Sequence, residues 1–315
     1  MLWGNLLHLS FNMWADTPDA VHEMPAYRDE LRCDDATWER ITAAMAAEGF
    51  DTVVVDLGDG VRWESHPEIA VPGAWSTGRL RDELTRLRQL GLTPIPKLNF
   101  SATHDTWLGD YGRMLSTEPY YRVCADLIAE ASALFDQPRL FHIGMDEETA
   151  SHQRLWQHAT IRKGDLWWHD LFFYADEVTR HGGRAWMWSD YIWDHPETFL
   201  SRMPRSILQS NWYYYEPFAA DEAGRPRPLT GFDRYLTYLD LDEHGFDQVA
   251  TGSAFVLLDN IDSTVRFCGG RLDPARFEGF LFAQWWPTMP ERLDDHLAAV
   301  ARVGAARRAH EALTA

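Results

Sequence analysis

The 315-residue sequence predicts an α/β fold, a (β/α)8 TIM barrel that forms a single domain over residues 1–315. Two observations support this prediction. Short apolar runs rich in β-branched residues alternate with segments of 3.6-residue apolar periodicity along the whole chain, which is typical of buried parallel strands joined by helices. No linker-like stretch interrupts the alternation, and eight strands, each followed by a helix or a long connection, are the number that closes such a barrel.

The predicted elements follow one another in order. The strands are expected near residues 2–10, 51–57, 92–99, 139–145, 184–189, 206–213, 247–253 and 278–285. The helices are expected at residues 36–50, 78–91, 120–135, 166–182, 232–246 and 294–313. Glycine-containing stretches such as EGFD and RHGGR lie where helices should end. A doubly wound open sheet is the alternative, but it would need a glycine-rich phosphate loop after the first strand, where the sequence reads HLSFNMWAD.

Composition narrows the classes of partner. The chain has 29 Lys and Arg against 48 Asp and Glu, a formal charge of −19, which disfavours nucleic acid and anionic membranes. Its three cysteines are widely separated, which fits a reducing compartment better than a disulfide framework. The apolar start has no basic n-region and no small-residue cleavage site, so we interpret it as a first strand. We expect a cytoplasmic protein, unless a leader has been removed, and a homo-oligomer is compatible with the sequence.

Polar and aromatic residues gather where the predicted strands end, which is where barrel enzymes carry their sites. An aromatic-walled pocket with carboxylates at its base suits a sugar, whose C–H faces stack on rings. These residues are Asn12, Trp14, Asp56, Asp59, Trp63, Asn99, His104, Trp107, Asp146, Glu147, Glu148, Trp186, Trp188, Asp190, Trp212, Tyr213, Tyr214, Tyr215, Asp259, Gln284, Trp285 and Trp286.

The stretch FHIGMDEETA, residues 141–150, places three acids side by side. If His142 points into the barrel, strand alternation points Asp146 inward as well, and Glu147 begins the loop over the mouth. Repulsion between neighbouring carboxylates raises one pKa, as a general acid near neutral pH requires. We expect Glu148 to be solvated and His142 to be an inward packing residue with one hydrogen bond.

Metal and nucleophilic-serine chemistry are disfavoured. His142 and Asp146 are four strand residues apart, roughly 13 Å at about 3.3 Å per residue, too far to share one ion. No G-x-S-x-G elbow is present. We therefore expect no metal and no cofactor, and a small glycoside or oligosaccharide as the partner.

FHIGMDEE resembles the His-x-Gly-Gly-Asp-Glu signature of the catalytic domain of glycoside hydrolase family 20, the β-N-acetylhexosaminidases, with Met145 in place of the second glycine. VVVDLGDGVRWESHPEIAVPGAW resembles the family's strand-2 stretch. LTPIPKLNFSATH is similar to its strand-3 segment, with Lys97 and Asn99 in place of acids. The residues at the positions of the family's aromatic pocket are Trp188, Trp212 and Trp286.

The resemblance implies a retaining exo-hydrolase that removes terminal β-linked N-acetylhexosamine by substrate-assisted catalysis. The substrate's own acetamido oxygen would attack the anomeric carbon and form an oxazolinium intermediate, an exception to the two-carboxylate scheme. Asp146 would stabilise the acetamido group as charge develops, and Glu147 would act as general acid and then base. A Tyr would bind the acetamido oxygen, and three Trp would enclose its methyl group.

The sequence departs from the family pattern in three ways. The strand-1 Arg is replaced in a region that reads Phe11-Asn12, and the strand-7 Tyr-Leu-Asp reads Leu-Leu-Asp at 257–259. The acetamido-binding Tyr would then be Tyr213 or Tyr214, and alternation favours Tyr214. We also expect the chain to lack the accessory N-terminal domain that is common in the family. These departures leave both GlcNAc and GalNAc open as the sugar.

Alternatives stay open for several residues and for the activity. His104 either caps a loop or pairs with Asp59 to steady the acid, and Asp190 and Asp259 are alternatively helix N-caps. The same carboxylate pair could serve a glycosidase acting on sugars without an acetamido group, or the barrel could bind sugar without catalysis. The residues predicted to bind the substrate are Trp188, Trp212, Tyr213, Tyr214, Trp285, Trp286, Asp190, Asp259 and Asn12.

Overall fold

The computed structural model describes residues 1–18, 25–154, 156–215, 218 and 234–314. Within them, eight parallel strands close into a barrel in the order β1-β10-β9-β8-β7-β6-β5-β2, which confirms the predicted fold. Each predicted strand overlaps one barrel strand. The strands are β1 (Leu2–His8), β2 (Thr52–Asp56), β5 (Thr93–Lys97), β6 (Leu140–His142), β7 (Arg184–Trp188), β8 (Leu208–Ser210), β9 (Gln248–Gly252) and β10 (Phe277–Ala283).

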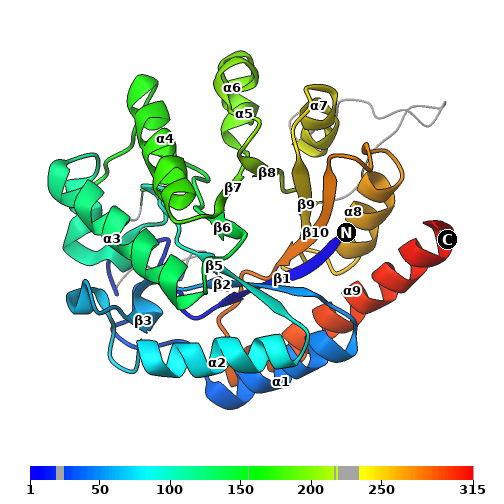
Figure 1. The fold of residues 1–315 in the computed structure, drawn as a ribbon, viewed down its shortest axis with the longest axis horizontal. Helices are drawn as coiled ribbons and strands as arrows, with labels where there is room; N and C mark the ends of the chain where they lie inside the picture. Colours follow the sequence, from blue (N-terminus) through cyan, green and yellow to red (C-terminus); the bar gives the residue numbers. More distant parts are fainter. Residues whose placement is uncertain (19–24, 155, 216–217, 219–233, 315) are drawn as a thin grey trace.

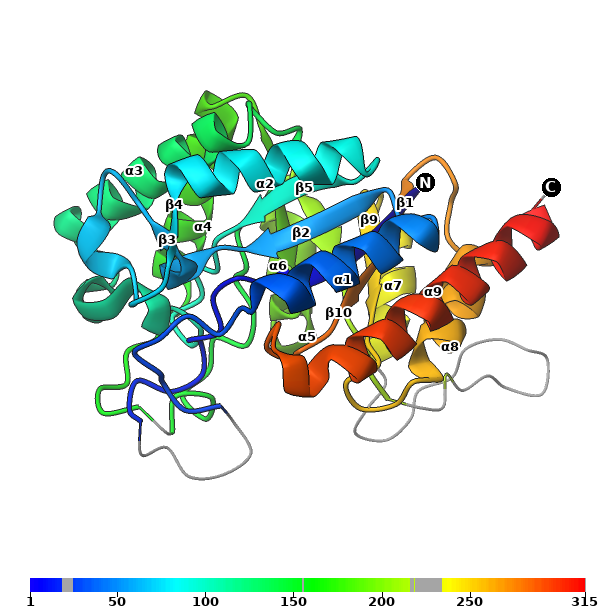
Figure 2. The same cartoon turned by 90° about the horizontal axis from the view of Figure 1, so that it is seen from below.

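Helices surround the barrel on its outside (Figure 1). α1 and α9 pack against each other, so the last helix of the chain closes the ring beside the first (Figure 2). The helices are α1 (Asp35–Ala47), α2 (Thr77–Gln89), α3 (Glu118–Leu134), α4 (Asp165–Arg180), α5 (Tyr191–Asp194), α6 (Pro196–Arg202), α7 (Thr237–Glu243), α8 (Asn260–Gly269) and α9 (Leu293–Thr314).

Five of the six predicted helices correspond to α1, α2, α3, α4 and α9. The sixth, at 232–246, begins outside the described residues and corresponds within them to α7 and the turn before it. α5 and α6 span only four and seven residues, too short for periodicity to reveal them. One glycine in each stretch expected to end a helix has a positive φ, as a left-handed helix terminus requires; these are Gly49, Gly91, Gly182 and Gly245.

Short elements lie between the barrel strands and the helices that follow them. Because these segments follow the carboxyl ends of the strands, they build the walls above the barrel. They are the two-stranded sheet of β3 (Val61–Arg62) and β4 (Trp75–Ser76) and the 3₁₀ helices η1 (Gly58–Gly60), η2 (Pro67–Ile69), η3 (Thr106–Met114), η4 (Arg234–Leu236) and η5 (Pro290–Arg292).

The side chains inside the barrel form an apolar layer and, next to it toward the carboxyl ends of the strands, a polar layer. Lys97 Nζ lies 2.6 Å from Asp56 Oδ2, and His8 Nδ1 lies 3.2 Å from the same oxygen. Burial acts to raise the pKa of Asp56, but these two neighbours hold that pKa below its usual value. The residues of the apolar layer include Leu6, Val54, Ile95 and Leu140. Two positions further along the same strands, in register, come His8, Asp56, Lys97 and His142.

None of the helices in the described part of the chain combines the length and apolar character needed to cross a membrane. The cysteines Cys33, Cys124 and Cys268 are buried and free.

Candidate active site

The acid triplet follows the short strand β6, and its backbone leaves the regular strand there. Phe141, Ile143 and Met145 pack in the outer core between barrel and helices, which confirms the predicted alternation. Gly144 has a φ of 73°, and a Cβ at this position would overlap Oδ1 of Asn99. Glycine is therefore required at 144, whereas the next residue, Met145, takes a φ of 74° with a full side chain.

Asp146 is buried and held by residues that follow β5. Its Oδ1 accepts a hydrogen bond from Asn99 Nδ2 at 2.9 Å. Its backbone oxygen accepts from the hydroxyls of Ser101 at 2.5 Å and Thr103 at 3.3 Å. Asn99 thus holds one oxygen of the carboxylate, the other oxygen lies 3.4 Å from His104 Nε2, and Asp146 lines the cavity above the barrel.

Glu147 projects into the same cavity, with 22% of its side chain exposed. Its backbone N–H donates to Oδ2 of Asp190 at 2.7 Å. His104 Nε2 lies 3.3 Å from Glu147 Oε2 and 3.4 Å from Asp146 Oδ2, so one imidazole contacts both carboxylates. His152 Nε2 lies 3.5 Å from the other Glu147 oxygen.

The pKa shifts in this cluster differ from those expected from repulsion between the neighbouring carboxylates alone. Burial acts to raise the pKa of Glu147, but the hydrogen bond and charge of His104 bring it below its usual value. Burial acts to lower the pKa of His104, but Asp146 and Glu147 raise it. Burial, then the charge of Asp146, raises the pKa of Asp190 to about 8. The sequence-based expectation of a raised pKa within the triplet is wrong for Glu147, because it left out the histidine.

A cavity of about 580 Å³ lies over the two carboxylates. Its size is within the range of small-molecule sites, and its walls are aromatic with a few polar groups, as in sites for sugars and similar ligands. The aromatic lining is Phe11, Trp14, Trp212, Tyr214, Tyr215, Phe255, Trp285 and Trp286. The polar lining is Asn99, His104, Asp146, Glu147, His152, Arg234 and Arg292.

Of the predicted substrate-binding residues, Trp212, Tyr214, Trp285 and Trp286 line this cavity. The Tyr214 ring stacks on Trp212 with centroids 5.0 Å apart. Tyr213 instead points into the outer core, where its ring packs against Phe218 and Tyr235. The structure therefore brings Tyr214, and not Tyr213, to the cavity, as the strand alternation favours.

Trp188 and His142 lie below the cavity, inside the barrel. Their ring centroids are 4.4 Å apart, and Trp188 lies 6.1 Å from Trp285 in the cavity wall. His142 Nδ1 accepts one hydrogen bond, from the Gly144 N–H at 3.1 Å, which matches the packing role predicted for it. Trp188 therefore does not line the cavity, contrary to the substrate-binding role predicted for it, and supports the aromatic wall from beneath.

Asn12, Asp59 and Asp259 are not where the sequence-based prediction put them. Asn12 is buried and donates to Asp59 Oδ2 at 2.7 Å, so its amide faces the protein and not the cavity. Asp59 also accepts from Ser10 Oγ at 2.6 Å and makes no pair with His104. Asp259 has an exposed side chain that pairs with Arg302. Their strands end at the barrel mouth, but the loops that follow turn these side chains away.

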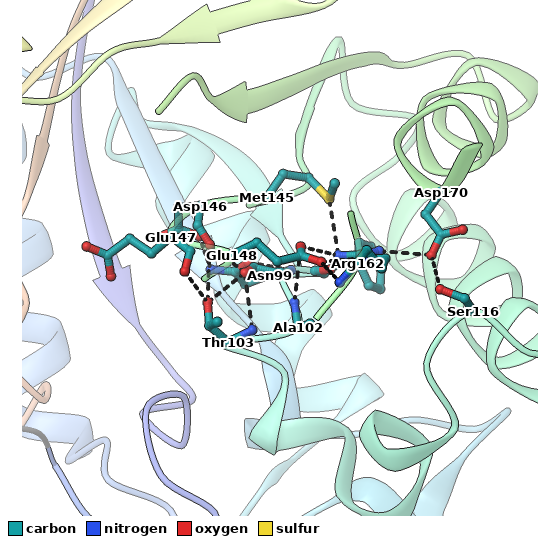
Figure 3. A network of polar contacts seen from close by, with 12 residues as sticks. Asn99, Ala102, Thr103, Ser116, Met145, Asp146, Glu147, Glu148, Arg162 and Asp170 are labelled. Carbon is teal, nitrogen blue, oxygen red and sulfur yellow. Dashed lines mark hydrogen bonds and ion pairs between the residues drawn. The ribbon is translucent and has the colours of Figure 1, made fainter. Parts of the chain in front are cut away.

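Asp190 and Glu148 also differ from expectation. Asp190 supports the Glu147 backbone from behind and does not line the cavity, and neither it nor Asp259 makes the side-chain N-cap hydrogen bond that was the alternative. Glu148 is not solvated: its side chain is 2% exposed and pairs with Arg162. Figure 3 shows Glu147 extending away from Arg162 while Glu148 turns toward it.

Periodicity gave no sign of several cavity residues. His152, Arg234, Phe255 and Arg292 lie in loops or at helix starts, where no periodic pattern distinguishes one polar or aromatic residue from another. The Arg234 guanidinium lies over the Trp193 ring, 4.0 Å from its centroid. Only their position in the chain could have indicated these four cavity residues, because each of them follows the carboxyl end of a barrel strand.

One group within the described residues could offer ligands to a metal. His104, Asp146 and Glu147 each have a ligand atom within 4.8 Å of the others. A histidine must be neutral to bind a metal, and Asp146 and Glu147 raise the pKa of His104, so a metal bound here would have to displace a more tightly held proton.

No family model and no curated protein matches this sequence. Solved structures do match. The family 20 exo-β-N-acetylglucosaminidase from Vibrio harveyi is 16% identical with a TM-score of 0.60, and the alignment covers 96% of this chain and 54% of that one. The family 20 chitobiase from Flavobacterium johnsoniae is 17% identical with a TM-score of 0.64, covering 89% and 48%.

A third match is the N-acetyl-β-hexosaminidase from Streptomyces plicatus in complex with Thio-NAglucal, 12% identical with a TM-score of 0.61, covering 96% and 63%. This chain therefore spans about half to two-thirds of the length of the structures that it matches. The resemblance inferred from FHIGMDEE is confirmed at the level of structure: the fold of this chain is the barrel found in family 20 β-N-acetylhexosaminidases.

Proposed function

We propose that this chain is a retaining exo-glycoside hydrolase that removes terminal β-linked N-acetylhexosamine by substrate-assisted catalysis. The observation that supports this best is the pair Asp146 and Glu147 on the floor of one aromatic-walled cavity, with His104 against both carboxylates. The solved structures with the same fold include an exo-β-N-acetylglucosaminidase in complex with N-acetylglucosamine and a β-hexosaminidase in complex with its product GlcNAc.

Asp146 is the group we assign to the acetamido group of the substrate. In the first step the acetamido oxygen attacks the anomeric carbon as the glycosidic C–O bond breaks, and positive charge spreads onto the acetamido nitrogen. A fixed carboxylate stabilises that charge and needs no reorganisation during the reaction. The bonds from Asn99 and Ser101 hold Asp146 in place for this role.

Glu147 is the group we assign to proton transfer. It donates a proton to the leaving oxygen, then takes one from the water that opens the oxazolinium ring. Its lowered pKa in the free protein leaves it ionised, but a bound sugar removes the water that still reaches its side chain. Desolvation favours the protonated carboxyl, so substrate binding raises the pKa of Glu147 and makes it ready to donate a proton.

The cavity wall supports sugar recognition. Trp212 and Trp285 offer flat apolar faces, and Tyr214, which lines the same cavity, is the residue that we assign to the acetamido oxygen. Arg234 and Arg292 supply donors for ring hydroxyls from positions unrelated to the strand-1 Arg of the family. Both GlcNAc and GalNAc remain within the proposal.

The test is turnover of 4-nitrophenyl β-GlcNAc, β-GalNAc, β-glucoside and β-galactoside, with and without EDTA. We expect release of nitrophenol from at least one N-acetylhexosaminide and none from the plain hexosides, unchanged by EDTA. Turnover of only the plain hexosides would support the alternative glycosidase without acetamido assistance. Binding of N-acetylhexosamine with no turnover of any substrate would support a sugar-binding barrel.

We extend the proposal to the setting of the reaction. The net charge of −19 and the three buried, free cysteines support a cytoplasmic enzyme acting on small glycosides. Cell fractionation checks the location, and size-exclusion chromatography with light scattering checks for a homo-oligomer.

A further inference from the structure

Glu148 and Arg162 form a buried ion pair directly behind the two carboxylates of the site. Arg162 Nε and Nη2 each lie 2.6 Å from one Glu148 oxygen, a two-pronged arrangement that fixes both side chains. The Glu148 side chain is 2% exposed and the Arg162 side chain 0%. The Arg162 backbone N–H also donates to Glu148 Oε1 at 3.0 Å. The pair therefore ties together the two ends of the loop that carries Glu147 (Figure 3).

Arg162 extends this link to the surrounding scaffold. Its Nη2 donates to the backbone oxygen of Phe100 at 2.7 Å, in the segment after β5. Its Nη1 donates to Tyr174 Oη at 2.8 Å and lies 3.1 Å from Asp170 Oδ2, both on α4. One guanidinium thus connects the β6–α4 loop, the β5 loop and helix α4.

The backbone between β6 and Glu148 needs such support. Met145 and Glu147 have φ values of 74° and 53°, a left-handed conformation that is unfavourable for residues with a side chain. Such conformations persist where the surrounding structure holds them, and they cluster at functional sites. The conformation at Glu147 has a visible consequence: it turns Glu148 toward Arg162 while Glu147 faces the cavity.

We propose that the Glu148–Arg162 pair is a positioning device for the proposed general acid: by holding the left-handed backbone of this loop, it sets the direction in which the Glu147 carboxylate points. The inference rests on the proposed function for its catalytic readout. Glu148 does not line the cavity and contacts no reacting atom, so it acts only through Glu147. A displacement of about 1 Å is enough to lower turnover roughly 100-fold.

The closing experiment compares Glu148→Gln with a matched control, Glu177→Gln. Glu177 is also a largely buried acid paired with an arginine, Arg180, but the pair lies on the far half of α4, away from the cavity. Each variant is assayed with two aryl β-N-acetylhexosaminides, one with a dinitrophenyl leaving group and one with a phenyl leaving group. Only the phenyl substrate depends strongly on proton donation.

We expect Glu148→Gln to lower kcat for the phenyl substrate roughly 100-fold, with a much smaller loss for the dinitrophenyl substrate and little change in KM. Glu177→Gln should leave both unchanged. If kcat fell equally on both substrates, in proportion to the fraction of folded protein, the pair would have only a structural role and the proposal would be overturned. Full activity in folded Glu148→Gln would overturn it as well.

A second variant and a second measurement keep the test decisive. If Glu148→Gln does not fold, Glu148→Asp keeps the charge but shortens the reach, and we expect the same leaving-group signature at smaller size. Amide hydrogen exchange of residues 145–149 needs no activity: it should accelerate in the Glu148 variants and not in Glu177→Gln. A wild-type protein without glycosidase activity would overturn the proposed function. Unchanged hydrogen exchange of residues 145–149 in the Glu148 variants would overturn the positioning role, whether or not the wild type is active.

Discussion

His104 Nε2 lies 3.3 Å from Glu147 Oε2 and 3.4 Å from Asp146 Oδ2, so a single buried imidazole contacts both carboxylates of the site. Two adjacent anions in a buried site are unfavourable without a compensating charge. This contact raises the pKa of His104 and lowers the pKa of Glu147. The contact therefore shifts the proton affinity of the free site from Glu147 toward His104.

The first prediction concerns the pH dependence of the wild type and of His104→Asn. A general acid must be protonated, so activity falls as pH rises through its pKa. His104 lowers the pKa of Glu147 in the free protein, so His104→Asn should move the basic limb of kcat/KM to higher pH. In the wild type, the basic limb of kcat should lie above that of kcat/KM, because bound sugar desolvates Glu147. A basic limb that stays in place in His104→Asn would contradict this account.

The second prediction separates the roles of the two carboxylates. Glu147→Gln should lower kcat on substrates with poor leaving groups by about 10²–10⁴-fold, and much less on activated ones, because only the former need proton donation. Asp146→Asn should lower kcat on both, since charge on the acetamido group develops whatever the leaving group. Steady-state rates on a leaving-group series give the comparison. Equal indifference to both changes would exclude the pair from the site.

The third prediction uses the buried carboxyl behind Glu147. Asp190 has a folded-state pKa of about 8, well above its unfolded value of about 3.9. Between these values the folded state holds a proton that the unfolded state has released, so the free energy of unfolding falls as pH rises. The slope is about 1.4 kcal/mol per pH unit for one such group. Asp190→Asn should therefore gain stability relative to wild type between pH 4 and 8.

Denaturant unfolding at several pH values measures that gain. Asp259→Asn is the matched control, because its carboxylate is exposed and should give no pH-dependent difference. A constant difference between Asp190→Asn and wild type across this range would mean that Asp190 is ionised in the folded protein.

The fourth prediction concerns the residue that departs from the family signature. Met145→Gly would relieve a left-handed backbone, a gain of roughly 1–2 kcal/mol. It would also remove a buried side chain that is 1% exposed, and losses for Met→Ala are about 2–5 kcal/mol. The packing loss equals or exceeds the relief of backbone strain, so we expect a net destabilisation of about 0–4 kcal/mol, from the difference of these ranges.

Urea unfolding of Met145→Gly tests this balance, and Gly144→Ala is its counterpart. Ala at 144 would meet Asn99 in the same left-handed conformation with nothing gained, so it should lose more stability than Met145→Gly. A Met145→Gly protein more stable than the wild type would show that backbone strain outweighs packing here.

Much of the framework was predictable from the sequence because it depends on local periodicity. Alternation along β6 correctly placed Phe141, Ile143 and Met145 in the outer core and directed Asp146 inward. Tyr214 was favoured over Tyr213 on the same reasoning. Along β6 the alternation holds because successive side chains of a strand point to opposite faces. At Met145 and Asp146 the directions agree with it although the backbone has already left the strand, with positive φ at 144 and 145.

The wrong predictions fall where side chains from distant segments meet. Glu148 reads as a solvated acid beside two others, and only its contact with Arg162 makes it a buried one. A pair between Asp59 and His104 was one of the two alternatives for that histidine, but the loop after β1 brings Ser10 and Asn12 to Asp59 instead. No periodic pattern describes these loops, so their partners cannot be read from spacing.

The sequence by itself determined the barrel, the order of its strands and the two carboxylates at the end of β6, because these follow from hydrophobic periodicity and from a motif. Only the tertiary structure decided which groups share a proton and which acid turns away from the site. Protonation depends on burial and on distances between residues such as His104 and Glu147, and the direction of Glu148 depends on a left-handed backbone held by Arg162. Both are properties of the packed chain.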